Sequence, residues 1–349
     1  MDLNSRIQTF IALGEIMAGF PEGATDDSLH FLKEAALRAE AANRWFTQPN
    51  IHHAIRTIGE SLTAKNLNQW LLPYMDLLAR TGNTIKTVGV VMAGNIPLVG
   101  FHDFLSVLIC GHRFAGKLSA QDSVLLPALL QLMTEADERW QEMVEFSTSP
   151  LRKFDAIIAT GSNNTFRYFD YYFRPYPNLI RRNRNGIAIL TGEETSLELS
   201  GLADDIMRYF GLGCRNVSKI YIPHGYDLKI LLPYFNEYKE MAYHNKYRNN
   251  YDYQKGILTV NNRPFIDSGN LILLEDKRIS TPVALLHFER YWEIRELARE
   301  ITASADLVQC VVCHSDPGVP FIRPGSSQQP ALWDYADGTD TVKFLLEEI

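Results

Sequence analysis

The sequence predicts an α/β protein with two domains, and three observations carry this prediction. From residue 86 onward, short apolar runs alternate with stretches of helical period, which is typical of a parallel sheet covered by helices. The chain has 349 residues, more than one hydrophobic core usually supports. Its 46% hydrophobic and 21% charged residues are ordinary for a globular protein. We expect domains over residues 1–195 and 196–320, and a tail over 321–349.

The first eighty residues are expected to be helical. Apolar side chains recur every three or four residues over 29–39 and again over 67–78, and Pro73 predicts a kink or a restart in the second stretch. The tail is different, because four prolines between 317 and 330 disfavour regular structure. We therefore expect the tail to cross back over the surface.

Strand-like runs begin at residue 87, and each is followed by a helical stretch. In the first alternating set we expect strands at 87–93, 113–116, 155–160 and 186–190, with helices at 104–109, 122–145, 163–173 and 197–210. In the second domain we expect strands at 218–222, 271–274, 284–288 and 307–313, with helices at 234–247 and 290–303. In such sheets ligands bind beyond the carboxyl ends of the strands, where Asn95, Lys117 and Ser162 fall.

Composition excludes several classes of function. A net charge of -7 argues against a general nucleic-acid binder. No run reaches the roughly 20 apolar residues of a membrane span, and the N-terminal segment mixes Asp2, Arg6 and Glu15 with apolar residues rather than forming an export signal. We expect a cytoplasmic protein whose four cysteines are reduced.

Cys214 is the strongest candidate nucleophile. It follows a predicted helix and precedes an apolar strand, and Gly211 and Gly213 remove side-chain cover from the sulfur and from the next N–H group. The thiolate attacks a carbonyl, and the charges of Arg215 and Lys219 would raise the thiolate fraction.

Four loops at strand ends hold polar residues, beginning at Gly94, Gly116, Thr160 and Thr191. The three-glycine dinucleotide fingerprint is absent, but Gly161-Ser162 opening a helix can bind pyrophosphate through its free N–H groups. Each loop alone is better explained as a turn, and the argument depends on their joint placement. Thr160, Asn163 and Asn164 could donate to phosphate, but capping of the helix explains at least one of them better.

The chain resembles the acyl-CoA reductases of the bacterial luminescence (LuxC) type, in the aldehyde dehydrogenase superfamily, from about residue 86 to the C-terminus. The segments that carry the resemblance are Gly94-Asn-Ile-Pro, Gly116-Lys-Leu-Ser, Ala159-Thr-Gly-Ser-Asn-Asn, Phe210-Gly-Leu-Gly-Cys-Arg-Asn-Val-Ser-Lys and Gln329-Pro-Ala-Leu-Trp-Asp-Tyr-Ala-Asp-Gly-Thr-Asp-Thr-Val-Lys-Phe-Leu345. It implies an aldehyde-dehydrogenase-like fold, with a Rossmann-type cofactor domain, which includes the N-terminal helices, and a second, catalytic α/β domain. It also implies reduction of a fatty acyl thioester to the aldehyde by NADPH, with coenzyme A as leaving group.

The same resemblance assigns site residues. Cys214 matches the nucleophile, and Asn95 the asparagine whose amide, with the N–H of the cysteine, holds the oxyanion. Lys117 and Ser119 match the loop that contacts the adenosine ribose, where a lysine could also meet a 2′-phosphate. Gly161 and Ser162 match the pyrophosphate turn, and Thr160 and Asn163 are candidate phosphate donors. Without Cys214, Asn95 would be explained as a turn residue after a strand. Lys117 is equally explained as a solvated lysine.

Two segments depart from the superfamily pattern. Glu193 and Glu194 lie near the position of the carboxylate that activates water in hydrolytic members, but closer to Cys214 in the chain than is usual, so helix capping explains them better. The stretch 277–283 resembles the segment that holds the nicotinamide ribose but lacks its glutamate.

Other signals are weaker. Cys310, Cys313 and His314 match the attachment motif of a c-type haem. Two cysteines three residues apart on a strand point to opposite faces and could not share a metal ion, and we expect neither haem nor metal. The arginines of 174–184 could meet coenzyme A phosphates or form a solvated loop, and the tyrosines of 234–253 could line an acyl chain or form a subunit contact in a homo-oligomer.

Alternative functions remain open at this point. One is reduction of an acyl phosphate or hydrolytic oxidation of an aldehyde. Another is an acyl-transfer protein that takes acyl groups onto Cys214 and passes them to a partner without redox chemistry, and a third is a scaffold without catalysis. For the predicted reductase, the substrate could be an acyl-CoA or an acyl carrier.

Overall fold

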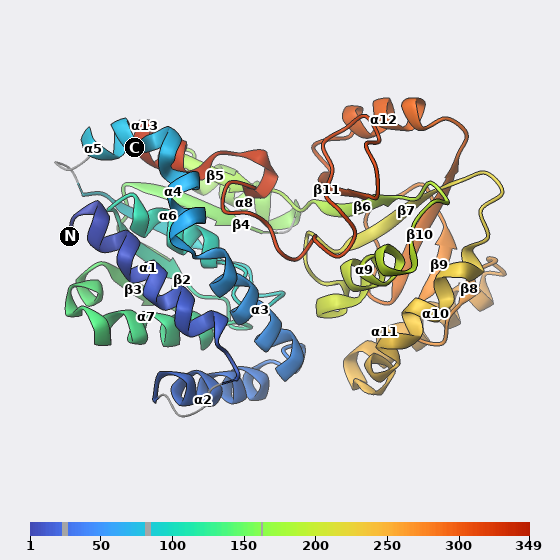
Figure 1. The fold of residues 1–349 in the computed structure, drawn as a ribbon, viewed down its shortest axis with the longest axis horizontal. Coiled ribbons are helices and arrows are strands. Elements are labelled where there is room, and N and C mark those ends of the chain that lie inside the picture. Colours follow the sequence, from blue (N-terminus) through green and yellow to red (C-terminus); the bar gives the residue numbers. More distant parts are fainter. Residues whose placement is uncertain (23–26, 81–84, 162) are drawn as a thin grey trace. The chain divides into compact units, whose positions relative to one another are not determined.

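The computed structural model describes residues 1–22, 27–80, 85–161 and 163–349 (Figure 1). The chain divides into two compact units, one of residues 1–183 with 331–349 and one of residues 184–330. The division drawn from the sequence placed its boundaries after residues 195 and 320. The structure is α/β with two sheets, as expected.

Unit 1 is built on a five-stranded parallel sheet of order β3-β2-β1-β4-β5. Its strands are β1 (Thr87–Val91), β2 (Arg113–Lys117), β3 (Val144–Ser147), β4 (Ala156–Thr160) and β5 (Asn178–Arg181). Its helices along this part of the chain are α6 (Phe101–Ile109), α7 (Leu125–Ala136) and α8 (Asn163–Phe173). Apolar residues of β1 and β4 are almost fully buried because helices cover both faces.

The N-terminal residues form the expected helices. They are α1 (Leu3–Ala18), α2 (Asp27–Ala42), α3 (Gln48–Ser61), α4 (Ala64–Leu71) and α5 (Met75–Arg80). Pro73 lies in a short 3₁₀ turn between α4 and α5, which is the predicted restart. Phe10 of α1 packs its ring edge-on against Trp140 at 5.8 Å, and both side chains are buried completely. This aromatic contact joins the N-terminal helices to the sheet's own core.

Two strands of the first sheet were missed from the sequence. The predicted helix over 122–145 ends at Ala136, where Asp137 turns the chain by accepting a hydrogen bond from the N–H of Arg139 at 3.1 Å, and β3 follows. β5 has only four residues, and the two that are buried are Leu179 and Arg181, so its sequence shows no alternation of apolar and polar residues. Short strands recruited by a neighbouring strand carry a weak local signal.

Unit 2 holds a six-stranded sheet of order β11-β6-β7-β10-β9-β8, in which only β8 runs antiparallel to its neighbour. Its strands are β6 (Asn185–Ile189), β7 (Val217–Pro223), β8 (Ile266–Asp267), β9 (Ile272–Glu275), β10 (Leu285–Tyr291) and β11 (Val308–Cys313). The expectation that 186–190 belongs to the first sheet is wrong, because β6 pairs with β7 and β11.

Helices α9 (Ser196–Met207) and α12 (Ile294–Ala303) lie on opposite faces of this sheet (Figure 1). Leu297 and Ile301 of α12 pack on Ile187 and Ile189 of β6. The single helix expected over 234–247 is instead α10 (Leu232–Phe235), a 3₁₀ stretch, and the start of α11 (Asn245–Val260). Tyr238, at φ -102°, interrupts the helical backbone there.

The end of the chain returns to unit 1 and forms α13 (Thr341–Glu347). Val342, Phe344 and Leu345 of this helix are buried in the core of unit 1. Before it, the indole N–H of Trp70 donates to the hydroxyl of Tyr335 at 2.8 Å. The proline-rich part of the tail is irregular, and the last part is packed rather than exposed.

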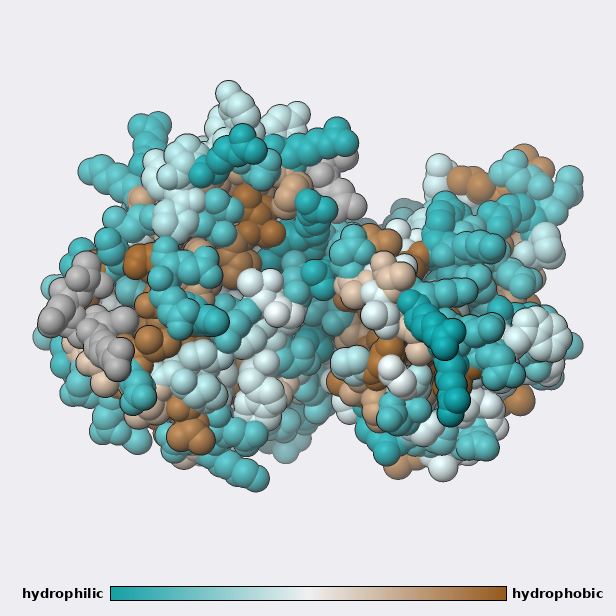
Figure 2. Space-filling model, turned by 90° about the horizontal axis from the view of Figure 1, so that it is seen from above, coloured by the Kyte–Doolittle hydropathy of each residue, from teal (hydrophilic) through white to brown (hydrophobic). Residues whose placement is uncertain are grey.

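Hydrophilic residues predominate on the face drawn in Figure 2, with small hydrophobic groups between them. Among the described helices, none combines the length and the hydropathy needed to span a membrane.

Candidate functional site

The carboxyl edge of the first sheet gathers the loops that carry the predicted cofactor residues. Val91, the last residue of β1, pairs with Lys117 of β2 on one side and with Ala159 of β4 on the other. The residues that follow these three strands therefore leave the sheet side by side. The chain moves outward from β1 through β2 to β3, and from β4 to β5 on the other side, so β1 and β4 form the topological switch point at which open α/β sheets bind ligands.

The loops after β1 and β2 touch each other. A Cβ atom on Gly94 would lie 2.4 Å from the hydroxyl oxygen of Ser119, so only glycine fits there. Asp122 accepts a hydrogen bond from the N–H of Leu98 at 2.8 Å, and its own N–H donates to the carbonyl of Ser119 at 3.1 Å. Burial raises the pKa of Asp122 to about 6. Asn95, half-buried in a bend of the first loop, and Ser119 thus lie on two connected loops.

Lys117 ends β2 half-buried, and its ammonium group has no hydrogen-bond or ion-pair partner among the residues that the structure describes. Thr160 ends β4 half-buried. A Cβ atom on Gly161 would lie 2.9 Å from the ring of Phe169, so this glycine lets α8 begin close to the strand end. Ser162 lies outside the described residues; Asn163 is the first residue of α8, and its side chain is likewise not described.

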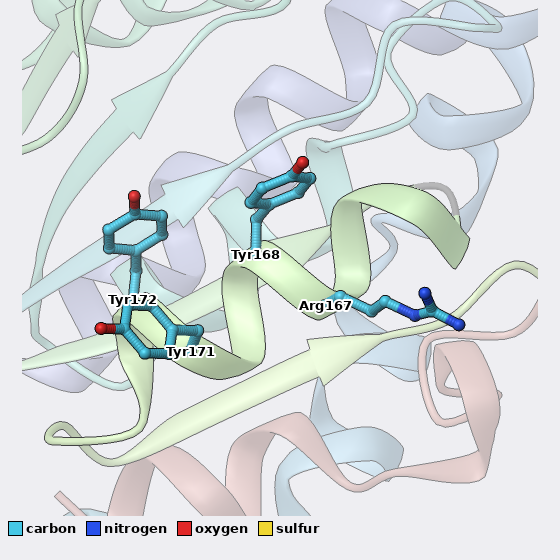
Figure 3. A pocket seen from close by; sticks show the side chains of 4 residues that line it. All are labelled: Arg167, Tyr168, Tyr171 and Tyr172. Carbon is cyan, nitrogen blue, oxygen red and sulfur yellow. The ribbon is translucent and has the colours of Figure 1, made fainter.

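Helix α8 also carries a pocket that sequence reasoning did not single out. Arg167, Tyr168, Tyr171 and Tyr172 line a cavity of about 640 Å³ (Figure 3). The three tyrosine rings are exposed, with Tyr171 at 77%. The run of aromatic residues at 166–173 was the available signal.

Cys214 lies in a turn directly before β7, at the amino edge of the second sheet. Its side chain is half-buried, whereas Cys110 and Cys313 are buried and burial raises the pKa of both thiols. Cys310 is also half-buried, and its thiol donates to the carbonyl of Arg215 at 3.7 Å. Of the four sulfur atoms, that of Cys214 thus lies in an accessible turn rather than within a strand or a core.

The backbone leading to Cys214 is strained. Tyr209, Phe210 and Gly211 have φ values of 53°, 60° and 71°, three successive residues in the left-handed region. This conformation costs an L-residue roughly 1–2 kcal/mol. The ring of Phe210 lies 4.6 Å from that of His244 and 5.6 Å from that of Tyr247, and these contacts help to hold it. Strain of this kind persists where the surroundings fix it, often beside a functional group.

Comparison with known proteins depends on structure alone, since no family model and no curated protein matches this sequence. An aldehyde dehydrogenase from Bacillus cereus in complex with NAD+ is 13% identical, with a TM-score of 0.56 over 90% of this chain and 72% of that one. Aldehyde dehydrogenase C from Pseudomonas syringae, in complex with NAD+ and octanal, is 10% identical, with a TM-score of 0.59 over 93% and 78%. An aldehyde dehydrogenase from Physcomitrella patens in complex with succinate is 12% identical, with a TM-score of 0.54 over 99% and 88%.

The fold is that of the aldehyde dehydrogenases. The expected fold is therefore confirmed, and the finer resemblance to the LuxC-type reductases stays a prediction.

Within this aldehyde-dehydrogenase-like fold, the two glutamates after β6 have different surroundings. Glu194 accepts hydrogen bonds from the N–H groups of Thr191 and Gly192 at 2.6 and 3.1 Å and from the hydroxyl of Thr191. Glu193 is 82% exposed, 4.0 Å from His314. The cap of α9 is made instead by Thr195 and Glu198, whose side chains each bond the other's backbone N–H.

The segment that lacks the superfamily glutamate is held to the sheet through three consecutive carbonyl groups. The carbonyl group of Lys277 accepts a hydrogen bond from the ammonium group of Lys219 at 2.7 Å. The carbonyl group of Arg278 accepts one from the ring of His287 at 2.8 Å, and that of Ile279 accepts one from the hydroxyl of Ser218 at 2.8 Å.

Lys219 is completely buried, and its ammonium group also pairs with Glu289 at 2.6 Å. Because Glu289 compensates its charge, Lys219 is a poor source of positive potential for Cys214. Sequence reasoning had assigned it that role, and no local signal marked its partners.

Metal chemistry finds no support in the described part of the chain, where no group of three histidine, cysteine or acidic side chains could hold an ion. Cys310 and Cys313 lie on β11, as the sequence predicted.

Proposed function

We propose that this protein reduces an acyl thioester, such as a fatty acyl-CoA, to the aldehyde with NADPH, and that Cys214 is the nucleophile. The observation that carries the proposal is the half-buried thiol in a strained turn at the edge of a sheet. It is supported by the fold, since solved proteins with this fold are aldehyde dehydrogenases, two of them in complexes with NAD+.

The residues proposed for the cofactor are Lys117, Ser119, Thr160, Gly161 and Asn163, with Ser162 outside the described part of the chain. Their chemistry fits a dinucleotide, because hydroxyl groups, a helix start and an ammonium group without a partner among the described residues meet at the switch point of the sheet. When bound, NADPH supplies the hydride. Lys117 would neutralise a phosphate, and the hydroxyl of Ser119 would donate to a ribose or phosphate oxygen.

Cys214 carries the acyl group in this proposal. Its thiolate forms a bond to the acyl carbon, the bond from that carbon to the sulfur of coenzyme A breaks, and coenzyme A leaves as its thiol after taking up a proton. Asn95 is proposed to donate its side-chain amide to the oxyanion, an interaction typically worth about 3 kcal/mol of barrier. Once the acyl carbon is reduced, its bond to Cys214 breaks and the aldehyde leaves.

The reductive direction is favoured by the surroundings of the glutamates. The carboxylate oxygens of Glu194 accept hydrogen bonds from nearby N–H and hydroxyl groups, and the side chain of Glu193 faces solvent. Hydrolysis of an acyl-enzyme needs a base that activates water. Reduction of an acyl-enzyme needs no such base.

Replacing the nucleophile tests the proposal. We expect Cys214→Ala to lower aldehyde formation by at least about 10³-fold, because the covalent step is lost, while NADPH binding measured by fluorescence titration stays within twofold of the parent. Cys310→Ser is the matched control, since it alters the other half-buried thiol and keeps a hydroxyl donor for Arg215. Aldehyde formation at the parental rate in Cys214→Ala would disprove the assignment.

A substrate panel separates the alternatives. Acyl-CoA esters of increasing length, an acyl phosphate, and an aldehyde with NADP+ are each followed by nicotinamide absorbance and product analysis. We expect turnover with acyl-CoA. A stable acyl adduct in the intact mass together with no NADPH binding would instead show acyl transfer without redox chemistry.

A further inference from the structure

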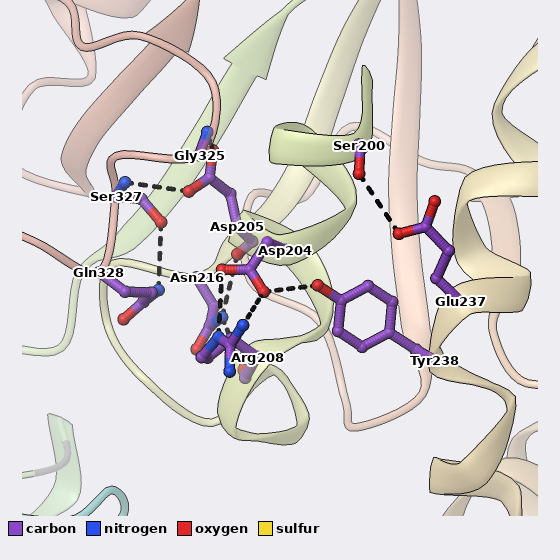
Figure 4. Close-up of polar contacts among 10 residues, drawn as sticks. All are labelled: Ser200, Asp204, Asp205, Arg208, Asn216, Glu237, Tyr238, Gly325, Ser327 and Gln328. Carbon is purple, nitrogen blue, oxygen red and sulfur yellow. Dashed lines mark hydrogen bonds and ion pairs between the residues drawn. The ribbon is translucent and has the colours of Figure 1, made fainter. Parts of the chain in front are cut away.

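Asn216, drawn in Figure 4 with its partners at the end of α9, closes the turn that holds Cys214. Its side chain is buried, with 2% exposed, and its Oδ1 accepts a hydrogen bond from the N–H of Gly213 at 2.8 Å. Its own N–H donates to the carbonyl of Gly213 at 3.1 Å. Gly213 and Asn216 are therefore joined by two hydrogen bonds, with Cys214 and Arg215 between them.

The amide nitrogen of Asn216 ties this turn to the end of α9. Its Nδ2 donates to the carbonyl oxygens of Asp205 and Arg208, both at 2.9 Å. Carbonyl groups in the last turn of a helix lack intrahelical partners, so Asn216 acts as a cap for α9 from a distant part of the chain. The two hydrogen bonds that cap the helix, together with the one from Gly213, thus join the nucleophile's turn to the end of α9.

The end of α9 is itself anchored on two further segments. Asp204 pairs with Arg208 and accepts a hydrogen bond from the hydroxyl of Tyr238 at 2.5 Å. Asp205 accepts from the N–H groups of Gly325 at 2.7 Å and Ser327 at 2.9 Å. Asn216 therefore connects Cys214 to a support that is rigid on both sides.

Only asparagine has the required chemistry at this position. The contacts need one acceptor and two donor hydrogens on a short planar group, which a carboxylate, a hydroxyl or an aliphatic side chain cannot supply. Tyr209, Phe210 and Gly211 hold left-handed φ values between the anchored carbonyl of Arg208 and the turn. Without the amide, this strained stretch is free to relax and to carry the sulfur with it.

We propose that Asn216 is a positioning residue, which sets the place of the Cys214 thiol through the turn. The inference rests on the proposed function only in taking Cys214 as the nucleophile.

The test compares Asn216→Ala with Asn270→Ala in the full chain. Asn270 is a matched control, because it is buried in the same unit, donates to the carbonyl of Phe235 at 2.7 Å and accepts from Ser268 at 2.7 Å. Each variant is measured for kcat, for KM of NADPH, for thermal unfolding, and for the pH dependence of iodoacetamide alkylation of Cys214, followed by peptide mass.

We expect Asn216→Ala to lower kcat about 10- to 100-fold with KM for NADPH within twofold, because a small misplacement of a reacting atom has that effect. The rate and the pH dependence of Cys214 alkylation should also differ from those of the parent, because the sulfur is no longer held in one place. Asn270→Ala should lower the unfolding temperature to a similar extent and leave both quantities at parental values. A parental kcat and alkylation profile in Asn216→Ala, or an equal loss in Asn270→Ala, would overturn the proposal.

Asn216→Asp provides a second variant, which keeps the acceptor for Gly213 and loses both donors. At low pH its carboxyl group takes up a proton and regains one donor, so its alkylation rate relative to the parent should rise as the pH falls. A ratio independent of pH would contradict the role of the donors. These thiol measurements stand apart from catalysis: if Cys214→Ala stays active, the proposed function fails while the positioning of the thiol is still tested.

Discussion

At the scale of single residues, the main feature of the candidate cofactor site at the carboxyl edge of the first sheet is the side chain of Lys117. Lys117 ends a central strand half-buried, and the described residues offer its ammonium group no counter-ion. Its neighbours along the edge are held by their own loops, as Gly94, Ser119 and Asp122 are. A cation left without a partner at a switch point favours an anionic ligand group.

Replacing this lysine gives a test of cofactor contact. We expect Lys117→Ala to raise the Kd for NADPH about tenfold, from about 1.5 kcal/mol for a hydrogen bond to a charged group, and to change the Kd for NADH less, because NADH lacks the 2′-phosphate. Lys153→Ala, just before the amino end of β4, is the control. Equal weakening of both cofactors would place Lys117 elsewhere than at the 2′-phosphate.

At the scale of the element, α9 is held at both ends by side chains. Thr195 and Glu198 form its capping box, and Asn216 takes its last carbonyl groups. A Cβ atom on Gly201 would lie 2.9 Å from the backbone nitrogen of Gly325, so the segment around 325 packs directly on the helix. Asp205 then receives two N–H groups of that segment. Burial raises the pKa of this carboxyl group from 3.8 to about 6.

The raised pKa predicts a dependence of stability on pH. The folded state binds the proton of Asp205 more tightly than the unfolded state does, so the group's contribution to stability falls as the pH rises from about 4 to about 6. The free energy of unfolding of the parent minus that of Asp205→Asn should decrease over this window by on the order of 3 kcal/mol and be constant above about pH 7. Urea unfolding of both proteins at several pH values measures it; a constant or rising difference would contradict it.

At the scale of the whole molecule, the chain ends by completing the core of the unit in which it began. Arg181 of β5 pairs with Asp103 of α6 at 2.5 Å, and its other terminal nitrogen donates to the hydroxyl of Thr341 at 2.8 Å. Both charged side chains are buried. Tyr74 donates to Asp340 at 2.5 Å, which adds a second polar anchor for α13.

The buried ion pair predicts an asymmetric mutational response. Arg181→Met leaves Asp103 as an uncompensated buried charge and should lower the free energy of unfolding by about 3–5 kcal/mol. Adding Asp103→Leu to that variant should restore most of the loss, because both charges are then gone. Chemical denaturation of the parent, the single variants and the double variant gives the coupling. A double variant no more stable than Arg181→Met would refute this account.

Much of the fold could be predicted from local pattern. The apolar runs of β1, β4 and β11 can be recognised as strands from the sequence, because a strand buried on both faces reads as a nearly continuous apolar run. The start of α8 and the turn at Cys214 were also visible, because glycines mark places where backbones must approach closely. Residue identity and spacing along the chain are enough for features of this kind.

Partners distant in sequence could not be predicted. That β6 joins the second sheet, that α13 packs in unit 1, that Glu289 compensates Lys219 and that Asn216 caps α9 all depend on contacts made only after the chain has folded. The sequence by itself determined the α/β class, most of the strand segments and the glycine-flanked cysteine turn, because each follows from local periodicity and backbone freedom. Tertiary structure alone decided the strand order and the choice of hydrogen-bond partners. Both arise from packing between segments that are distant in the chain, and nothing in the sequence of one segment identifies the other.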